Sequence, residues 1–158
     1  MAVLLISYDG LMEPLGQSQV FEYAKKLAKK HEMFLLTFEK PQDLEDSKRR
    51  RFLEKTTRES NVRWFRLKYH KHPTLLATSY DLLCGILTGL FIVLRHRIRV
   101  VHGRGYISSA IALMVKRILG TRFVFDMRGF WADEKLESGY WQEGSLVYRL
   151  TKWLEKPF

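Results

Sequence analysis

The sequence predicts an α/β fold in which a parallel, doubly wound sheet lies between two layers of helices. Short apolar runs of strand length alternate along the chain with longer segments of helical periodicity, which is typical of repeated β-α units. Most of these runs are apolar at nearly every residue, as in strands covered on both faces. No internal repeat or low-complexity linker interrupts the alternation, so residues 1–158 are predicted to form a single domain.

The first β-α unit contains a loop suited to anions. Residues 2–8 are almost entirely apolar and are predicted to form a central strand. Residues 9–19 contain two glycines and a proline, which favour an irregular loop, and residues 18–30 then show helical periodicity. Such a loop presents free backbone N–H groups and the positive end of a helix dipole. It matches neither the GxGxxG nor the Walker pattern, so neither dinucleotide nor P-loop nucleotide binding is predicted.

Two more strands and a basic helix follow. Residues 33–38 are predicted to form a second buried strand, which Pro41 ends. Residues 43–51 have acids first and a basic run later, the charge order that a helix dipole favours. Residues 62–67 are predicted to form a third strand, and their interleaved arginines place it at an edge of the sheet.

Residues 74–94 form a long apolar segment whose only charged residue is Asp81. Its length is borderline for a transmembrane helix, and the spacing of Gly85 and Gly89 is one at which helices pack closely. Asp81 near its middle and the β-α alternation on both sides argue against a membrane span. We expect a buried helix, or one that touches a membrane in part, with its glycines close to the sheet.

The last units supply two strands and two helices. Residues 99–102 are predicted to form the fourth strand, and Ser108 or Ser109 can cap the helix that ends at Gly120. Residues 123–126 are predicted to form the fifth strand, and residues 143–156 a final helix.

The polar residues after the fifth strand are the main site candidate. Residues 126–134 read DMRGFWADE, a charged and aromatic cluster directly after an apolar run. Ligands of open α/β sheets bind outside the carboxyl ends of the parallel strands. We expect the first and fifth strands to lie side by side, so that this cluster and the loop at 9–19 share one hollow. A salt-bridged loop that joins two elements is the alternative.

The composition leaves several partners open. The formal net charge is +10, and residues 45–71 hold ten Lys and Arg against four acids. Such a surface attracts phosphosugars, acidic lipid headgroups or nucleic acid, and a merely solvated face fits as well. The single cysteine, Cys84, excludes an internal disulfide and a cysteine-based zinc site. Met1 leads directly into a strand without a basic leader, so a cytoplasmic location is expected.

Two motifs resemble a known family. Ser7–Gly10 running into Pro14–Gln19, and Asp126–Glu134, are similar to the N-terminal, acceptor-side domain of GT-B glycosyltransferases. The most similar group is the retaining "family four" set, which builds bacterial surface polysaccharides. The similarity spans the whole chain in element order. It implies a Rossmann-like domain that binds the acceptor and faces a second domain, which binds the nucleotide-sugar donor. It also implies that no metal or other cofactor is required.

The resemblance also implies which residues form the site. Arg128 falls where relatives place a cleft His or Arg, and Gly16, Gln17 and Ser18 match a turn near the donor phosphates and the acceptor. We therefore expect Arg128 and Asp126 to act in catalysis. The residues expected to bind substrate are Gly16, Gln17, Ser18, His102, Arg104, Gly129, Trp131, Asp133 and Glu134.

The chemistry of glycosyl transfer suits these residue types, although structural roles compete with it. Negative charge develops on the departing diphosphate, which backbone N–H groups and the fixed guanidinium of Arg128 can stabilise. Asp126 either orients Arg128 or an acceptor hydroxyl, or forms a structural ion pair with Arg128. For His102, Trp131 and residues 133–134, packing or helix-start roles are the alternatives to substrate contacts.

Part of the family's pattern is not found in these 158 residues. The C-terminal domain, with its paired glutamates and diphosphate-binding Arg or Lys, is absent, and the closing strands of the first domain would follow Phe158. We expect a truncated N-terminal domain that is inactive alone.

Three classes of function remain. The first is the acceptor-binding domain of an enzyme that moves a sugar from a nucleotide-sugar to a glycan or lipid-linked acceptor, in cell-surface polysaccharide synthesis. The second is a nucleic-acid-binding module that uses Trp64, Phe65 and Tyr69 among the basic residues, which we do not expect. The third is a membrane-surface domain that uses residues 45–71 and 74–94. The first and third are compatible, and together predict a peripheral position on the inner face of the cell membrane.

Overall fold

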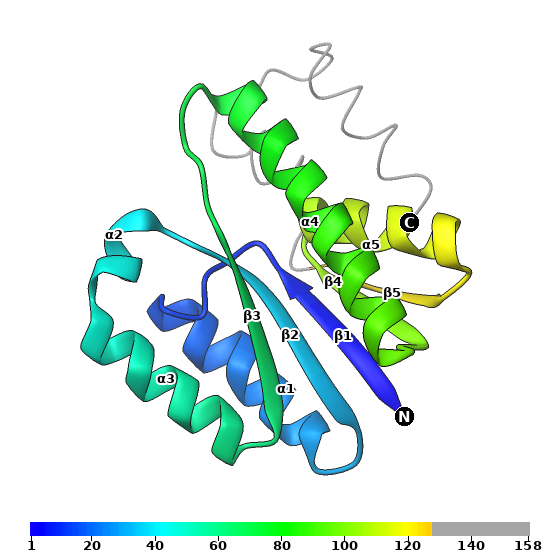
Figure 1. Ribbon diagram of the computed structural model, residues 1–158, viewed down its shortest axis with the longest axis horizontal. Coiled ribbons are helices and arrows are strands. Elements are labelled where there is room, and N and C mark those ends of the chain that lie inside the picture. The colour runs from blue at the N-terminus through cyan, green and yellow to red at the C-terminus, as the bar shows by residue number, and fades with distance from the viewer. Residues whose placement is uncertain (128–158) are drawn as a thin grey trace. The chain divides into compact units, whose positions relative to one another are not determined.

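Residues 1–127 are described by a computed structural model, apart from the side chains of Thr74 and Leu75 (Figure 1). Five strands form one sheet in the order β3-β2-β1-β4-β5, and residues Met1–Asp126 make one compact unit. The elements in chain order are β1 (Ala2–Ser7), a π-helical segment (Gly16–Phe21), α1 (Glu22–Ala28), β2 (Glu32–Glu39), α2 (Pro41–Glu45), α3 (Ser47–Glu59), β3 (Val62–Lys68), α4 (Thr74–His96), β4 (Val100–Arg104), α5 (Tyr106–Leu119) and β5 (Arg122–Asp126).

The chain winds outward from β1 in two directions. It runs from β1 through β2 to β3, and α4 then carries it back past β1 to β4 and on to β5. All four strand pairs are parallel. Because such crossovers are right-handed, the reversal puts helices on both faces of the sheet. Figure 1 shows α1 and α3 on one face and α4 and α5 on the other. The predicted three-layer, doubly wound sheet is confirmed.

The central strands face two cores. Leu4 and Ile6 of β1 join a cluster with residues of α4 and α5, whereas Val3 and Leu5 join a second cluster on the side of α1. A strand that is covered on both faces needs an apolar residue at every position. This explains why β1 and β2 are apolar almost without interruption.

The two outer strands of the described sheet differ from the central ones. In β3 only Val62 is buried, and the basic residues Arg63, Arg66 and Lys68 are exposed, as predicted for an edge strand. β5 is also partly exposed, and β4 separates it from β1. The prediction that the first and fifth strands lie side by side is therefore wrong. The long α4 crossover delivers β4, not β5, to the free side of β1.

Two predicted helix starts are corrected by the local backbone. Residues 43–51 do not form one helix, because Asp46 leaves helical geometry (φ −73°, ψ 83°). Its side chain instead accepts a hydrogen bond from the N–H of Arg49 at 3.0 Å and caps α3. The predicted loop at 9–19 is also wrong in its second half, since helical structure already covers Gly16–Phe21.

The β4–α5 connection is tighter than predicted. β4 continues to Arg104, and α5 begins directly after Gly105, which has a φ of +77°. Ser108 and Ser109 therefore lie inside the helix and do not cap it. Ser109 donates its hydroxyl to the carbonyl of Gly103 at 3.0 Å instead. The predicted stop at Gly120 is confirmed by its left-handed φ of +68°.

α4 is built into the fold along one side. Gly85 and Gly89 let it approach α5, where the nearest side chains are those of Ile111 and Val115. The buried carboxylate of Asp81 accepts hydrogen bonds from the hydroxyl of Tyr8 and the backbone N–H of His70, both at 3.0 Å. By length and composition Leu76–His96 is apolar enough to cross a membrane. The glycines lie on the packed side of α4, where Gly85 comes close to Phe38 of the sheet as well as to α5. The helix is only partly buried, and its contact with a membrane stays a prediction.

Candidate functional site

A row of four polar side chains crosses the sheet near the carboxyl ends of its strands. Thr37 of β2 pairs in register with Ser7 of β1, Ser7 with Arg104 of β4, and Arg104 with Asp126 of β5. Residues in register share a face of a sheet, and Arg104 contacts the helical segment before α1. The row therefore lies on the face that α1 covers. We call these four residues the edge row.

Arg104 is fixed by two neighbours. Its Nη2 donates to Oε1 of Gln19 at 2.5 Å, and its Nη1 lies 3.5 Å from Oδ2 of Asp126. A cation held from both sides keeps its planar donor group in one orientation. Asp126 thus has an ion-pair partner on the neighbouring strand. The predicted pairing of Asp126 with Arg128 concerns a residue outside the described part of the chain.

His102 lies on the same face, two residues before Arg104. It is buried, packs edge-on against Tyr23 with ring centroids 5.5 Å apart, and places Nε2 3.7 Å from Oδ2 of Asp126. Burial lowers the pKa of His102, and nearby Arg104 lowers it further, while Asp126 acts in the opposite direction. His102 is therefore a neutral imidazole at neutral pH, with one ring nitrogen able to accept a hydrogen bond.

Several buried polar atoms here have no hydrogen-bond partner in the described protein. They are Oγ of Ser7, Nε2 of His102, Nε of Arg104 and Oγ of Ser108. They come from β1, from β4 and from the first turn of α5. β1 and β4 flank the point where the strand order reverses, which is where open α/β sheets bind ligands. Buried polar groups normally have partners, so this group of atoms is the candidate binding site.

The loop after β1 holds an internal carboxylate. Glu39, at the end of β2, accepts hydrogen bonds from the N–H of Leu11 at 2.7 Å, the N–H of Met12 at 2.9 Å and the hydroxyl of Thr37 at 2.5 Å. Burial raises the pKa of Glu39, although these donors lower it. The expected free N–H groups of this loop are thus already bonded at Leu11 and Met12. Sequence reasoning missed Glu39, although an acid directly after an apolar strand was a visible signal.

Gly16, Gln17 and Ser18 are helical rather than part of an open turn. A Cβ on buried Gly16 would come within 1.9 Å of the carbonyl oxygen of Gly10, so glycine is required there for backbone packing. The N–H of Gln17 donates to the carbonyl of Glu13 at 3.0 Å. The exposed Ser18 places its hydroxyl 3.4 Å from the carbonyl of Leu15. The structure assigns Gly16 a packing role, and the predicted substrate contacts of all three residues stay untested.

The other predicted site residues lie outside the described part of the chain. These are Arg128, Gly129, Trp131, Asp133 and Glu134, together with the predicted helix at 143–156. Their assignments stay predictions. Within residues 1–127 no three His, Cys, Asp or Glu side chains are grouped as metal ligands, and the expectation that no cofactor is needed also stays a prediction.

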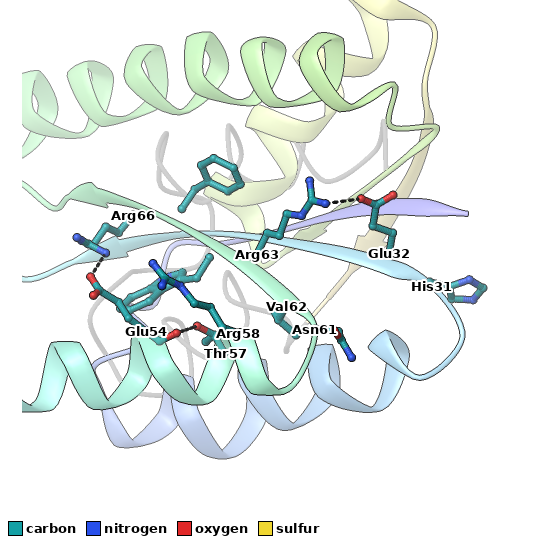
Figure 2. Close-up of a pocket in the computed structure, with 11 residues that line it drawn as sticks. His31, Glu32, Glu54, Thr57, Arg58, Asn61, Val62, Arg63 and Arg66 are labelled. Atoms are coloured by element: carbon teal, nitrogen blue, oxygen red, sulfur yellow. Dashed lines mark hydrogen bonds and ion pairs between the residues drawn. The ribbon is translucent and has the colours of Figure 1, made fainter.

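A cavity of about 570 Å³ lies at the opposite edge of the sheet, between α3 and β3 (Figure 2). Two of its arginines are ion-paired, Arg63 with Glu32 at 3.2 Å and Arg66 with Glu54 at 2.7 Å. Figure 2 shows both pairs among the side chains that line the cavity. Its charges largely neutralise one another, and it lies at an edge strand rather than at the strand-order reversal. We therefore assign the functional site to the group of buried polar atoms at the strand-order reversal and not to this cavity.

The aromatic residues that the nucleic-acid alternative would use make contacts within the fold. Trp64 donates its ring N–H to Oγ1 of Thr37 at 2.7 Å. Phe65 stacks on Phe34 at 6.4 Å between ring centroids, and Tyr69 packs edge-on against Tyr8 at 5.4 Å. The prediction that these rings could provide free stacking surfaces is wrong.

The solved structures that are similar to this chain include a glycosyltransferase and MurG. A glycosyltransferase from Rickettsia africae ESF-5 superposes with a TM-score of 0.53 at 10% identity, over 85% of this chain and 33% of its own. MurG of Acinetobacter baumannii superposes with a TM-score of 0.54 at 14% identity, over 84% of this chain and 38% of its own. The chain has the fold of a glycosyltransferase domain.

These comparisons confirm the predicted Rossmann-like fold of the GT-B type. The chain spans 33% of the length of the first structure and 38% of the length of the second. No family model and no curated protein matches the sequence. At these identities the likeness concerns the fold, and it does not reach the finer assignment to the retaining family-four group.

Proposed function

We propose that this chain is the acceptor-binding domain of a glycosyltransferase that moves a sugar from a nucleotide-sugar to a glycan or lipid-linked acceptor, in cell-surface polysaccharide synthesis. One observation carries the proposal. Ser7, His102, Arg104 and Ser108 bring to the strand-order reversal buried polar atoms that have no hydrogen-bond partner within residues 1–127, in a fold shared with two glycosyltransferases. A sugar, with a hydroxyl on almost every carbon, is the class of ligand that such mixed donors and acceptors suit.

The reaction breaks the bond between the anomeric carbon and the diphosphate, and it forms a bond from that carbon to an acceptor oxygen. The acceptor hydroxyl loses its proton, and negative charge develops on the diphosphate. On this proposal His102 accepts a hydrogen bond from an acceptor hydroxyl, since its imidazole is neutral. Asp126 holds Arg104 in place, and Arg104 donates to the substrate. Arg128 supplies further positive charge to the leaving group.

The proposal has consequences beyond the described site. The N–H groups of Leu11 and Met12 are bonded to Glu39, so positive charge for the diphosphate comes mainly from arginines. A further domain binds most of the nucleotide-sugar, and the 158-residue chain does not transfer sugar by itself. We also propose that the transfer retains the configuration of the anomeric carbon and requires no metal.

Saturation-transfer NMR with the 158-residue chain tests the acceptor site. The probes are free hexoses, N-acetylhexosamines and polyprenyl-phosphate-linked sugars. Arg104→Gln removes a charge-assisted donor and should weaken binding of the sugar that gives the strongest signal about tenfold or more. Arg63→Gln is the matched control, because Arg63 is also ion-paired, with Glu32 at 3.2 Å, at the far edge of the sheet. Equal binding by wild type and Arg104→Gln, or an equal loss in Arg63→Gln, would contradict the proposal.

A further inference from the structure

The outer face of α4 is a continuous apolar stripe. Every exposed position from residue 80 to residue 94 carries a large apolar side chain, and Leu76 extends the pattern by one turn. The exposed fractions reach 72% at Leu76 and 65% at Leu94. The members of this stripe are Leu76, Tyr80, Leu83, Leu87, Phe91 and Leu94. Their spacing of three and four residues keeps them on one side of the helix, over about 27 Å of length.

Within residues 1–127 the fold does not bury this stripe. The opposite side of α4 supplies the buried positions Ala77, Asp81, Ile92 and Val93, which face the sheet and α5. Isolated apolar residues are common on protein surfaces, but a contiguous stripe of this length marks an interaction site. Withdrawing α4 to span a membrane would separate the Asp81 carboxylate from Tyr8 and His70. The helix therefore stays in the domain and offers only its outer face.

Exposed cations gather at one end of the stripe. α4 and α5 both return from the carboxyl edge of the sheet to its amino edge, so their last turns end together with the starts of β4 and β5. The N–H of Arg122 donates to the carbonyl of Arg99 at 2.9 Å and joins these segments. The exposed cations here, which we call the basic rim, are Arg95, Arg97, Arg99, Lys116, Arg117 and Arg122.

Within residues 60–125, which contain the whole stripe and rim, no exposed acid opposes this charge, and exposed Glu32 at the start of β2 is paired with Arg63 at 3.2 Å. Between residues 60 and 125 the sequence contains eleven Lys and Arg and one acid, Asp81, which is buried and hydrogen-bonded inside the domain. A protein partner with matching acids and an apolar groove would fit one part of such a surface. An anionic bilayer fits all of it, since its headgroups attract the rim while the acyl boundary accepts the apolar side chains.

We infer that the α4–α5 face, through the apolar stripe and the basic rim, docks this domain on an anionic lipid bilayer with α4 lying parallel to the membrane plane. The basic residues of α3 do not take part in this contact, because α3 lies on the other face of the sheet (Figure 1). The proposed contact therefore does not include the whole of residues 45–71, which were expected to act with residues 74–94 on one membrane surface. The inference goes beyond the proposed function, because lipid binding requires no sugar site.

Co-sedimentation with vesicles tests the inference. The 158-residue chain should pellet with vesicles of phosphatidylcholine and phosphatidylglycerol, pellet much less with phosphatidylcholine alone, and be released by salt. Phe91→Asp should weaken partitioning, and Leu87→Asp combined with Phe91→Asp should weaken it about a hundredfold. Replacing Arg95, Lys116 and Arg117 by Gln should cost about fivefold for each cation removed.

The far face supplies matched controls. Phe52 of α3 is 64% exposed against 62% for Phe91, so Phe52→Asp makes the same chemical change at equal exposure and should leave partitioning unchanged. Lys48, Arg51 and Arg58, all exposed on α3, replaced together by Gln, serve as the control for charge. Circular dichroism verifies folding of each variant, and Arg104→Gln should bind vesicles as wild type does.

Three results would overturn the inference. The first is wild-type protein that stays in the supernatant with anionic vesicles. The second is an equal loss in the α3 controls, which would indicate a nonspecific charge effect. The third is a dimer in size-exclusion chromatography that Leu87→Asp with Phe91→Asp converts to monomer while vesicles bind neither form, which would assign the stripe to a second copy. None of these results bears on sugar binding.

Discussion

Replacing Glu39 with alanine tests how the loop after β1 is held. The carboxylate is the acceptor for the backbone N–H groups of Leu11 and Met12, and both residues are fully buried. Glu39→Ala leaves both donors without that acceptor and away from water. An unsatisfied buried donor costs about 1–3 kcal/mol, so two of them cost about 2–6 kcal/mol. The desolvation that raises the pKa of Glu39 in the fold is relieved, which places the expected loss in the lower half of that range.

Glu39→Gln separates hydrogen bonding from charge. With its amide oxygen in the position of Oε1, the glutamine keeps the bonds from Leu11 and Thr37. Its amide nitrogen then faces the N–H of Met12, so one donor is lost and the expected cost is about 1–3 kcal/mol. The two variants should therefore rank with Glu39→Ala as the less stable.

Urea denaturation of the 158-residue chain measures these losses as changes in midpoint at constant m-value. Glu13→Ala is the control from the same loop. Glu13 pairs with Lys40 at 2.7 Å, and both side chains are partly exposed, so its removal should cost about 0–1 kcal/mol. If Glu39→Ala were no less stable than Glu13→Ala, the carboxylate would not be what holds this loop.

Two further predictions concern α4 and the site. Gly85→Ala should be less stable than Gly89→Ala by about 1–3 kcal/mol in urea. The gain in helix propensity is the same for both variants. The new Cβ at position 85 would lie 2.5 Å from Cδ1 of buried Ile111, whereas the new Cβ at position 89 would lie 3.2 Å from Cγ2 of Val115. Equal stabilities of the two variants would contradict this packing. Burial lowers the pKa of His102 below 6.5 in the folded chain. As the pH falls, His102 is therefore protonated in the unfolded chain before it is protonated in the folded chain. Its contribution to stability is complete above about pH 6.5 and is lost as the pH falls toward the folded-state pKa. His102→Gln should therefore gain stability relative to wild type between about pH 8 and about pH 5, and parallel curves of urea midpoint against pH would refute a neutral buried imidazole.

Elements with strong local patterns could be predicted from the sequence. The apolar run of β1 indicated a strand with two covered faces, and the arginines of β3 indicated an edge. Gly120 ended α5 as expected, because a left-handed C-cap is a local property of glycine. These features depend on residues that are near one another in the chain.

What the sequence did not reveal depends on distant residues. The hydrogen bond that the N–H of Leu11 donates to Glu39 joins residues 28 positions apart in the sequence. The pairing of Arg104 with Asp126 follows from the register of β4 and β5. The helical geometry at Gly16 depends on close approach to Gly10, which only the folded loop creates. The prediction that the first and fifth strands are neighbours was wrong for the same reason, because a local sequence pattern does not indicate which strand the α4 crossover places beside β1.

The single carboxylate of α4 has a consequence for how the domain reaches one folded state. A helix that is apolar on both sides gains almost as much by burying either one, so hydrophobicity alone leaves its rotation about its own axis undecided. Asp81 removes that ambiguity, because only one rotation brings it to the hydroxyl of Tyr8 and the N–H of His70. Burying this carboxylate away from Tyr8 and His70 would cost desolvation free energy. That cost keeps the six large apolar side chains of α4 pointing away from the sheet, where a partner outside this domain can reach them.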